Sequence, residues 1–207
     1  MSCPLTVPPI PTTHIEVERR SACSLVRLVS EDGTNRLTRA CVRALTETLD
    51  SLSGAGRPLI ITGNGHFFSA GADLTEIHAL DGPSAYEFAR MGQTLMRALE
   101  QFPAPVCAAI HGYCMGGGLD LALVCHRRVA SPHAVFGHRG AALGLMTGWG
   151  GTQRLPRIVG RAGALEIFVS AEKIRAPQAL AMGLVDAIAE DPVVHALRRI
   201  ENAPAVP

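Results

Sequence analysis

The stretch PVCAAIHGYCMGGGLDLA, residues 105–122, joins an apolar run to a helical pattern through a loop of small residues. A second stretch, PLIITGNGHFFSAGADL at residues 58–74, has the same layout. In each we predict a short buried strand, a Gly-containing loop and the start of a helix. Small residues let a ligand approach backbone N–H groups closely, and a helix N-terminus adds free N–H donors. Facing each other, two such loops could form an oxyanion hole, although each alone is also explained as a tight strand-to-helix turn.

The rest of the chain alternates strand and helix patterns, which indicates an α/β fold. We divide it into a Pro-rich N-terminal arm at residues 1–13, a core domain at 14–190 and a short C-terminal tail at 191–207. The further strands are expected at residues 14–20 and 23–30, as a hairpin, and at 127–131, 134–137 and 184–189. The further helices are expected at residues 37–52, 84–101, 150–159, 161–170 and 176–182.

Composition is typical of a soluble globular domain. The chain has 207 residues, of which 47% are hydrophobic and 18% charged, and its formal net charge is +1. Nucleic-acid or membrane-surface binding usually needs a clustered basic face, so neither is predicted. The six cysteines form no CxxC pair, which favours buried, reduced thiols over disulfides or a metal site. The N-terminal residues contain no long apolar run, so we expect no signal peptide and a cytoplasmic location.

Four fragments in consistent order resemble the crotonase family, the enoyl-CoA hydratase/isomerase superfamily. They are FFSAGADL, AIHGYCMGGGLDLAL, GWGGTQRLPRIVG and AMGLVDAI, and the resemblance runs from about residue 14 to residue 190. It implies a crotonase-type spiral of β-β-α units with flanking helices, and a trimer or a dimer of trimers. It also implies an acyl-CoA substrate, with coenzyme A entering as part of the thioester and no permanently bound cofactor. In the chemistry shared by the family, two backbone N–H groups stabilise a thioester enolate.

Carried over by position, the two N–H groups would belong to Ala72 and Gly117. The path of the thioester and pantetheine would be lined by neighbouring residues of the same two loops, namely Ala70, Gly71, Asp73, Leu74 and Gly116. Because these are main-chain roles, side-chain identity matters mainly through small size.

The hydratases of the family use two glutamates, and this sequence departs from them at both positions. Asp120 occupies the first position and Gly140 the second, within a run from Leu121 to Leu165 that contains no Asp or Glu. Paired carboxylates suit hydration because one accepts a proton while the other donates. The departure therefore leaves Asp120 as a single acid/base carboxylate, or as a first-turn Asp that complements the helix dipole.

Three other residues have two interpretations each. His138 flanks Gly140 and could act as an acid or base, but a histidine in a strand-edge loop is expected at the surface. Trp149 could belong to the core or contact the acyl group. Asn35 is expected to cap or brace the helix at 37–52.

A last departure is that the chain ends at Pro207, before the helices with which family members commonly cover the acyl site. We therefore expect a more open site, or a lid supplied by a neighbouring chain.

Three functions stay open from the sequence. The first is an acyl-CoA enzyme of the hydratase/isomerase type that relies on Asp120. The second is another one-base chemistry, such as isomerisation, thioester hydrolysis or decarboxylation. The third is a catalytically weak acyl-CoA-binding or scaffold subunit.

Overall fold

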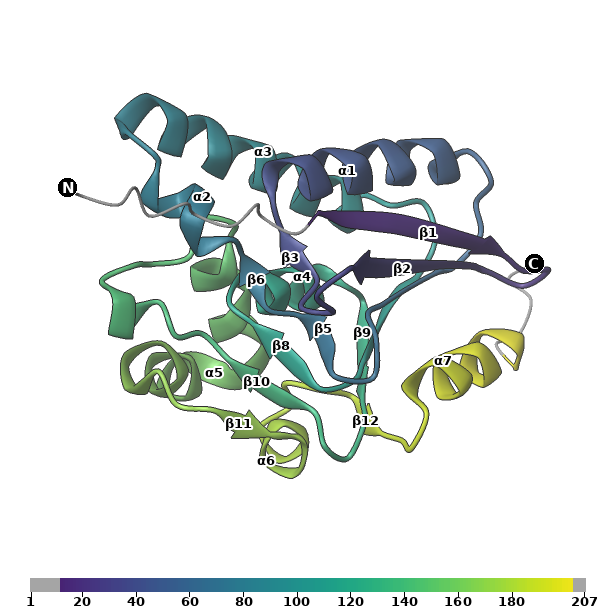
Figure 1. Ribbon diagram of the computed structural model, residues 1–207. Helices are drawn as coiled ribbons and strands as arrows, with labels where there is room; N and C mark the ends of the chain where they lie inside the picture. The colour runs from purple at the N-terminus through teal and green to yellow at the C-terminus, as the bar shows by residue number, and fades with distance from the viewer. Residues whose placement is uncertain (1–11, 203–207) are drawn as a thin grey trace.

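Two predominantly parallel sheets form the centre of the computed structural model, which describes residues 12–202 (Figure 1). A six-stranded sheet has the order β1-β2-β4-β7-β9-β12, a four-stranded sheet has the order β11-β10-β8-β5, and β3 pairs with β6. The strands are β1 (Thr13–Arg19), β2 (Ser24–Ser30), β3 (Arg36–Leu37), β4 (Leu59–Thr62), β5 (Phe67–Ser69), β6 (Gly71–Ala72), β7 (Val106–Ile110), β8 (Tyr113–Met115), β9 (Arg127–Ala130), β10 (Val135–Gly137), β11 (Ile174–Arg175) and β12 (Ala187–Ile188).

The helices lie between and after these strands. They are α1 (Arg39–Ser53), α2 (Leu74–His78), α3 (Gly82–Glu100), α4 (Gly117–Val124), the 3₁₀ helix η1 (Ala141–Leu143), α5 (Gly151–Ser170), α6 (Ala176–Ala181) and α7 (Pro192–Glu201). In the pairs β4 and β5, β7 and β8, and β9 and β10, the first strand belongs to the six-stranded sheet and the second to the four-stranded sheet. Each pair is followed by helix, so the chain advances as a spiral of β-β-α units, which confirms the expected fold class.

The core lies between the sheets and the helices α1, α3 and α4. Figure 1 shows α1 and α3 side by side, and α4 in the middle of the molecule. Every residue of α4 from Gly118 to Val124 is buried, as expected for a helix that is apolar on nearly all sides. The body of the helix is therefore fixed by packing, which holds its N-terminus in place.

Inner strands of the six-stranded sheet, such as β2 and β4, are buried on both faces. Val26 and Ile61 point into the main core, while their neighbours Leu25 and Ile60 point the other way, because successive side chains of a strand alternate. On that second face they pack with Ala196 of α7. The segment 191–207, set apart above as a tail, thus contains a helix that covers the sheet.

Most elements lie where the patterns place them. The hairpin of β1 and β2 is antiparallel, and α5 is divided by a non-helical Gly160, between the two expected helices at 150–159 and 161–170. The expected loop within residues 58–74 contains two short strands, β5 and β6, because each finds a partner strand that comes from elsewhere in the chain. The N-terminal arm lies outside the described residues, except for its last two.

Asn35 does not cap the following helix, and the expectation that it would do so was wrong. The N-cap of α1 is Thr38, whose hydroxyl accepts a hydrogen bond from the backbone N–H of Cys41. Asn35 is fully buried with φ 52°, and its amide donates to the carbonyl oxygen of Phe67 at 2.9 Å. Its side chain therefore braces β5 rather than the helix.

Cys23, Cys41, Cys114 and Cys125 are buried and Cys107 is half-buried, all as free thiols. Among the described residues, no group of three or more His, Cys, Asp or Glu side chains could hold a metal ion. None of the described helices combines the length and the apolar character that crossing a membrane requires.

The packing of α4 against β5 predicts a sensitive glycine. A Cβ atom on Gly118 would lie 2.8 Å from the carbonyl oxygen of Ser69, whereas one on Gly54 would meet nothing within 4 Å. We expect Gly118→Ala to lower the free energy of unfolding by about 1–3 kcal/mol through overpacking. Gly54→Ala, as control, should leave it unchanged or raise it by up to about 1 kcal/mol. Urea unfolding measures both, and a Gly118→Ala variant as stable as the parent contradicts this account of the packing.

Candidate active site

A largely apolar cavity of about 640 Å³ is lined by residues of α2, α3, the start of α4 and the segment 138–149. Apart from the indole of Trp149, its polar side chains are those of Asp120, His138, Arg139 and Thr147. The sequence-predicted residues that line it are Ala70, Ala72, Leu74, Gly116, Gly117, Asp120, His138, Gly140 and Trp149. Apolar walls around a few polar groups are typical of small-molecule sites.

The two predicted N–H donors come together on one wall of this cavity. A Cβ atom on Gly117 would lie 3.4 Å from the backbone nitrogen of Ala72, so the two loops touch. Gly71, with φ +92°, allows this approach: a Cβ atom there would lie 2.6 Å from the carbonyl oxygen of Met115. Gly117 is the first residue of α4, where a backbone N–H has no acceptor within the helix.

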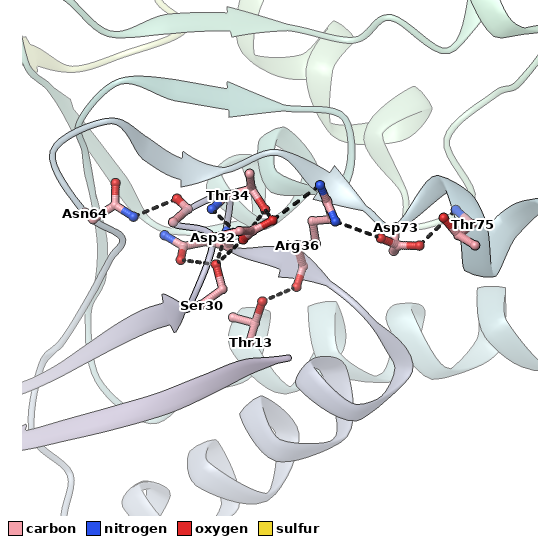
Figure 2. Close-up of polar contacts among 10 residues, drawn as sticks. Thr13, Ser30, Asp32, Thr34, Arg36, Asn64, Asp73 and Thr75 are labelled. Atoms are coloured by element: carbon pink, nitrogen blue, oxygen red, sulfur yellow. Dashed lines mark hydrogen bonds and ion pairs between the residues drawn. The ribbon is translucent and has the colours of Figure 1, made fainter. Parts of the chain in front are cut away.

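The loop that carries Ala72 is held by a polar cluster around Arg36 (Figure 2). β6 pairs with β3, so that Leu37 lies opposite Ala72. The Arg36 guanidinium lies 3.4 Å from the Asp32 carboxylate and 3.5 Å from the Asp73 carboxylate, and Figure 2 shows it between the two. The hydroxyl of Thr13 donates to the carbonyl oxygen of Arg36 at 2.8 Å.

Asp73 has a structural role for its side chain. Its carboxylate accepts from the backbone N–H groups of Thr75 at 2.8 Å and Glu76 at 3.0 Å, and so caps α2. Only 2% of Asp73 is exposed, and neither Asp73 nor Gly71 lines the cavity. Gly71 and Asp73 therefore fix the conformation of the loop. A main-chain contact of either residue with the thioester or pantetheine stays a prediction.

Asp120 lies in the first turn of α4 and is only 2% exposed. Its Oδ2 accepts a hydrogen bond from the Thr147 hydroxyl, while its Oδ1 has no hydrogen-bond partner within the described residues. Burial raises the pKa of the Asp120 carboxyl to about 6, against the opposing effects of the Thr147 hydrogen bond and the positive charge of Arg154. A carboxyl with such a pKa can both take up and release a proton near neutral pH.

The residues around Asp120 leave room for it. A Cβ atom on Gly151 would lie 2.1 Å from Oδ1 of Asp120, so only glycine fits at the start of α5. Arg154, one turn further along α5, donates to the carbonyl oxygen of Trp149 and forms an ion pair with Glu100, both at 3.1 Å. Arg154 thus links α5, α3 and the turn that carries Trp149.

At the second carboxylate position, Gly140 is enclosed by its own loop. The backbone N–H groups of Leu143 and Leu145 both donate to the Gly140 carbonyl oxygen at 2.8 Å. A Cβ atom on Gly140 would lie 2.5 Å from the carbonyl oxygen of Leu145. Backbone therefore occupies the space in which a side chain at residue 140 would begin.

His138 is buried, and the expectation of a surface histidine was wrong. Only 6% of it is exposed, and its ring meets that of Phe168 edge-on, with centroids 5.2 Å apart. Burial lowers the pKa of His138, so the imidazole is mostly neutral at pH 7. Its Nε2 has no hydrogen-bond partner within the described residues. The covering residue comes from α5, thirty positions later, which the local pattern around residue 138 does not reveal.

Trp149 belongs to the core, as one of its two interpretations expects, whereas contact with an acyl group stays a prediction. It is 4% exposed, its ring lies 5.3 Å from that of Phe88, and it also lines the cavity. A Cβ atom on Gly92 would lie 2.0 Å from the indole nitrogen, and one on Gly117 would lie 2.7 Å from a carbon of the same indole. Two glycines therefore make the slot that holds Trp149 against the start of α4.

The comparison with known proteins identifies the family. Residues 18–203 match the family model described as enoyl-CoA hydratase/isomerase. The chain belongs to this family. A relative from Bacillus subtilis (strain 168), described as a probable enoyl-CoA hydratase, is 46% identical over 160 residues, or 76% of this chain. The match spans 62% of the length of that relative.

Solved structures agree with the enoyl-CoA hydratase/isomerase assignment. An enoyl-CoA hydratase from Thermoplasma volcanium GSS1 is similar with a TM-score of 0.89 and 33% identity, over 95% of this chain and 79% of that one. DspI from Pseudomonas aeruginosa is similar with a TM-score of 0.87 and 32% identity, over 95% of this chain and 76% of that one. The resemblance to the crotonase superfamily is thereby confirmed.

Sequence reasoning missed Thr147, Gly151 and Arg154 as neighbours of Asp120. A signal for Thr147 is present, since it is the one hydroxyl-bearing residue between Gly140 and Gly151. Nothing in the sequence indicates its partner, because 27 positions separate it from Asp120.

The raised pKa of Asp120 predicts a pH-dependent stability difference. The folded state binds a proton at this carboxyl more tightly than the unfolded state, whose value is near 3.8. The contribution of Asp120 to the free energy of unfolding therefore falls as pH rises from about 4 to about 6. Asp120→Asn has no carboxyl at this position and does not show this loss. The Tm of the variant minus the Tm of the parent should therefore be larger at pH 7.5 than at pH 4. Calorimetry measures it, with the exposed Asp50→Asn as control, and a difference in Tm that is constant across this range contradicts the assignment.

Proposed function

We propose that the cavity binds an acyl-CoA thioester and that Asp120, as the single acid/base carboxyl, moves a proton along the acyl chain. Enoyl-CoA is the proposed substrate class, coenzyme A forms part of that substrate, and no other cofactor is required. The observation that carries this proposal is one buried carboxyl with a pKa of about 6 on the same cavity wall as Ala72 and Gly117.

The proposed steps use only groups of this chain. The Asp120 carboxylate takes a proton from a carbon next to the thioester or the double bond, and the electron pair moves to the thioester oxygen. The N–H groups of Ala72 and Gly117 then donate to that oxygen and stabilise its negative charge. Asp120 returns the proton to another carbon, which leaves the double bond shifted by one position. No group is consumed, so the carboxylate is regenerated.

Isomerisation is the reaction that this arrangement favours. One carboxyl can take and return the same proton, whereas addition of water in the pattern of the family uses a second carboxyl. At that second position Gly140 offers no side chain, and the Leu145 carbonyl oxygen occupies the space beside it. Hydration with Asp120 alone, or another one-base reaction, is the second candidate.

A weakly catalytic acyl-CoA-binding subunit is the third candidate, and a specific observation favours it as well. Gly140 offers no carboxyl and has no room for a side chain, and only 2% of Asp120 is exposed. The cavity therefore presents little carboxylate surface to a substrate. Tight binding of acyl-CoA by the parent protein without any product would support this candidate and contradict the proposed activity.

Asp120→Asn tests the proposal directly. We expect the variant to lose about 10²–10⁴-fold in kcat with 2-enoyl- and 3-enoyl-CoA substrates, because it lacks the acid/base group. Binding of a saturated acyl-CoA, measured by calorimetry, should change little because the cavity keeps its shape. Asp50→Asn, on the exposed side of α1, is the matched control. An Asp120→Asn variant that turns over like the parent removes Asp120 from the mechanism, and mass spectrometry of the products separates isomerisation from hydration.

We also infer assembly as a trimer or a pair of trimers, in the cytoplasm. Exposed apolar side chains on α5 and the preceding loop support an interface: Leu143, Met146, Leu165 and Val169 are each more than half exposed. Assembly should bury part of this surface, since large exposed apolar patches are rare on monomers. Light scattering after size-exclusion chromatography should give three or six times the chain mass, and a monomer contradicts the inference.

A further inference from the structure

Thr147 stands in an unusual place for a residue without a role in the mechanism above. It is half-buried on the cavity wall, and its hydroxyl is the hydrogen-bond donor to the Asp120 carboxyl. The backbone N–H of Trp149 donates to the same hydroxyl oxygen at 3.3 Å. Thr147 is thus linked both to the carboxyl and to the turn that holds the indole.

These two hydrogen bonds have fixed directions. Because the Trp149 N–H can only donate, it occupies an acceptor site on the Thr147 oxygen, and the Thr147 hydrogen is then directed at Oδ2 of Asp120. An oxygen that receives this hydrogen bond is stabilised as part of the ionised carboxylate. Loss of this hydrogen bond would therefore favour the protonated carboxyl.

The second carboxylate oxygen of Asp120, Oδ1, differs from Oδ2. It is buried and has no hydrogen-bond partner within the described residues. It lies 2.1 Å from the place of a Cβ atom on Gly151, so it packs against the start of α5. Among the described residues, the Thr147 hydroxyl is therefore the one hydrogen-bond partner of the Asp120 carboxyl.

We propose that Thr147 is a positioning residue, whose hydroxyl holds the Asp120 carboxyl through Oδ2 and keeps it ionised and oriented for exchange of the substrate proton. This rests on the proposed function, since it assigns the group that prepares Asp120 for its acid/base role. Thr147 works through Asp120 and takes part in no bond change of its own.

Other groups that face Asp120 do not replace this contact. The Arg154 guanidinium from α5 favours the ionised carboxylate through its charge alone, and its hydrogen bonds go to Trp149 and Glu100. The Cys114 thiol from β8 is fully buried, and burial raises its pKa well above the ordinary value, so it stays neutral. His138 lines the same cavity and stays mostly neutral at pH 7.

Thr147→Val tests the proposal, because valine keeps the shape and lacks the hydroxyl. Without the donor, the Asp120 carboxylate is less stable, and the acidic limb of the kcat–pH profile should move up by about one to two pH units. At pH 7 this means a loss of about two- to tenfold in kcat, with a smaller change in KM, since the cavity wall is unchanged. Thr147→Ser, which keeps a hydroxyl, should show the acidic limb of the kcat–pH profile at the same pH as the parent.

The control variant is Thr152→Val at the start of α5. Thr152 is also half-buried, but it lies outside the cavity and its hydroxyl accepts only a 3.5 Å hydrogen bond from Gln153. Thr152→Val should show the acidic limb of the kcat–pH profile at the same pH as the parent. A general effect of a Thr-to-Val change near α5 would instead shift the kcat–pH profiles of both valine variants.

A second readout needs no turnover. In Thr147→Val, the decrease of Tm with rising pH that Asp120 causes should extend above pH 6, whereas in Thr147→Ser it should end where it ends in the parent. A Thr147→Val variant with the parent's dependence of Tm and kcat on pH, or a Thr147→Ser variant that behaves like Thr147→Val, overturns the proposal. An active Asp120→Asn variant overturns the proposed function instead, so the two failures are distinguishable.

Discussion

The close approach of two loops is the constraint on which the site depends. The loop before α2 and the N-terminus of α4 can touch because residue 71 is a glycine: a side chain there would collide with the backbone of Met115 and Gly117. Because α4 is buried from Gly118 to Val124, its packing holds it in this contact. On the other side, the Arg36 ion pairs and the β3–β6 pairing hold the loop of Ala72 in place. The backbone of Ala72 and Gly117 is thus fixed by packing, as the proposed oxyanion hole would require of a preorganised site.

The same burial accounts for the chemistry of Asp120. A carboxyl removed from water favours its protonated form, which opposes folding at neutral pH and brings the pKa to about 6. Thr147 and Arg154 limit this effect, so the group stays largely ionised at pH 7 and still gives a proton back readily. A stable fold has no need of an unpartnered carboxyl oxygen at its centre, so the arrangement is better explained by function.

Sequence reasoning predicted what depends on local pattern. The β-β-α succession, the kink at Gly160 and the meeting of the loops of Ala72 and Gly117 follow from periodicity, from small residues and from the resemblance to the crotonase family. It failed where a contact is distant in the chain. The burial of His138 depends on Phe168, the partner of Asp120 is Thr147, and Asn35 binds β5 rather than capping the next helix. In each case a short motif shows the residue but not the surface that packs against it.

The central claim is that Asp120 exchanges a proton with carbon while Ala72 and Gly117 stabilise the enolate. Its most direct test is to incubate the protein with a saturated acyl-CoA, such as butyryl-CoA, in deuterated water and to follow the α-carbon hydrogens by proton NMR. The account predicts that the parent replaces these hydrogens with deuterium and that Asp120→Asn does not, although both bind the thioester. Exchange at equal rates in both proteins, or its absence in a parent that binds butyryl-CoA, would contradict it.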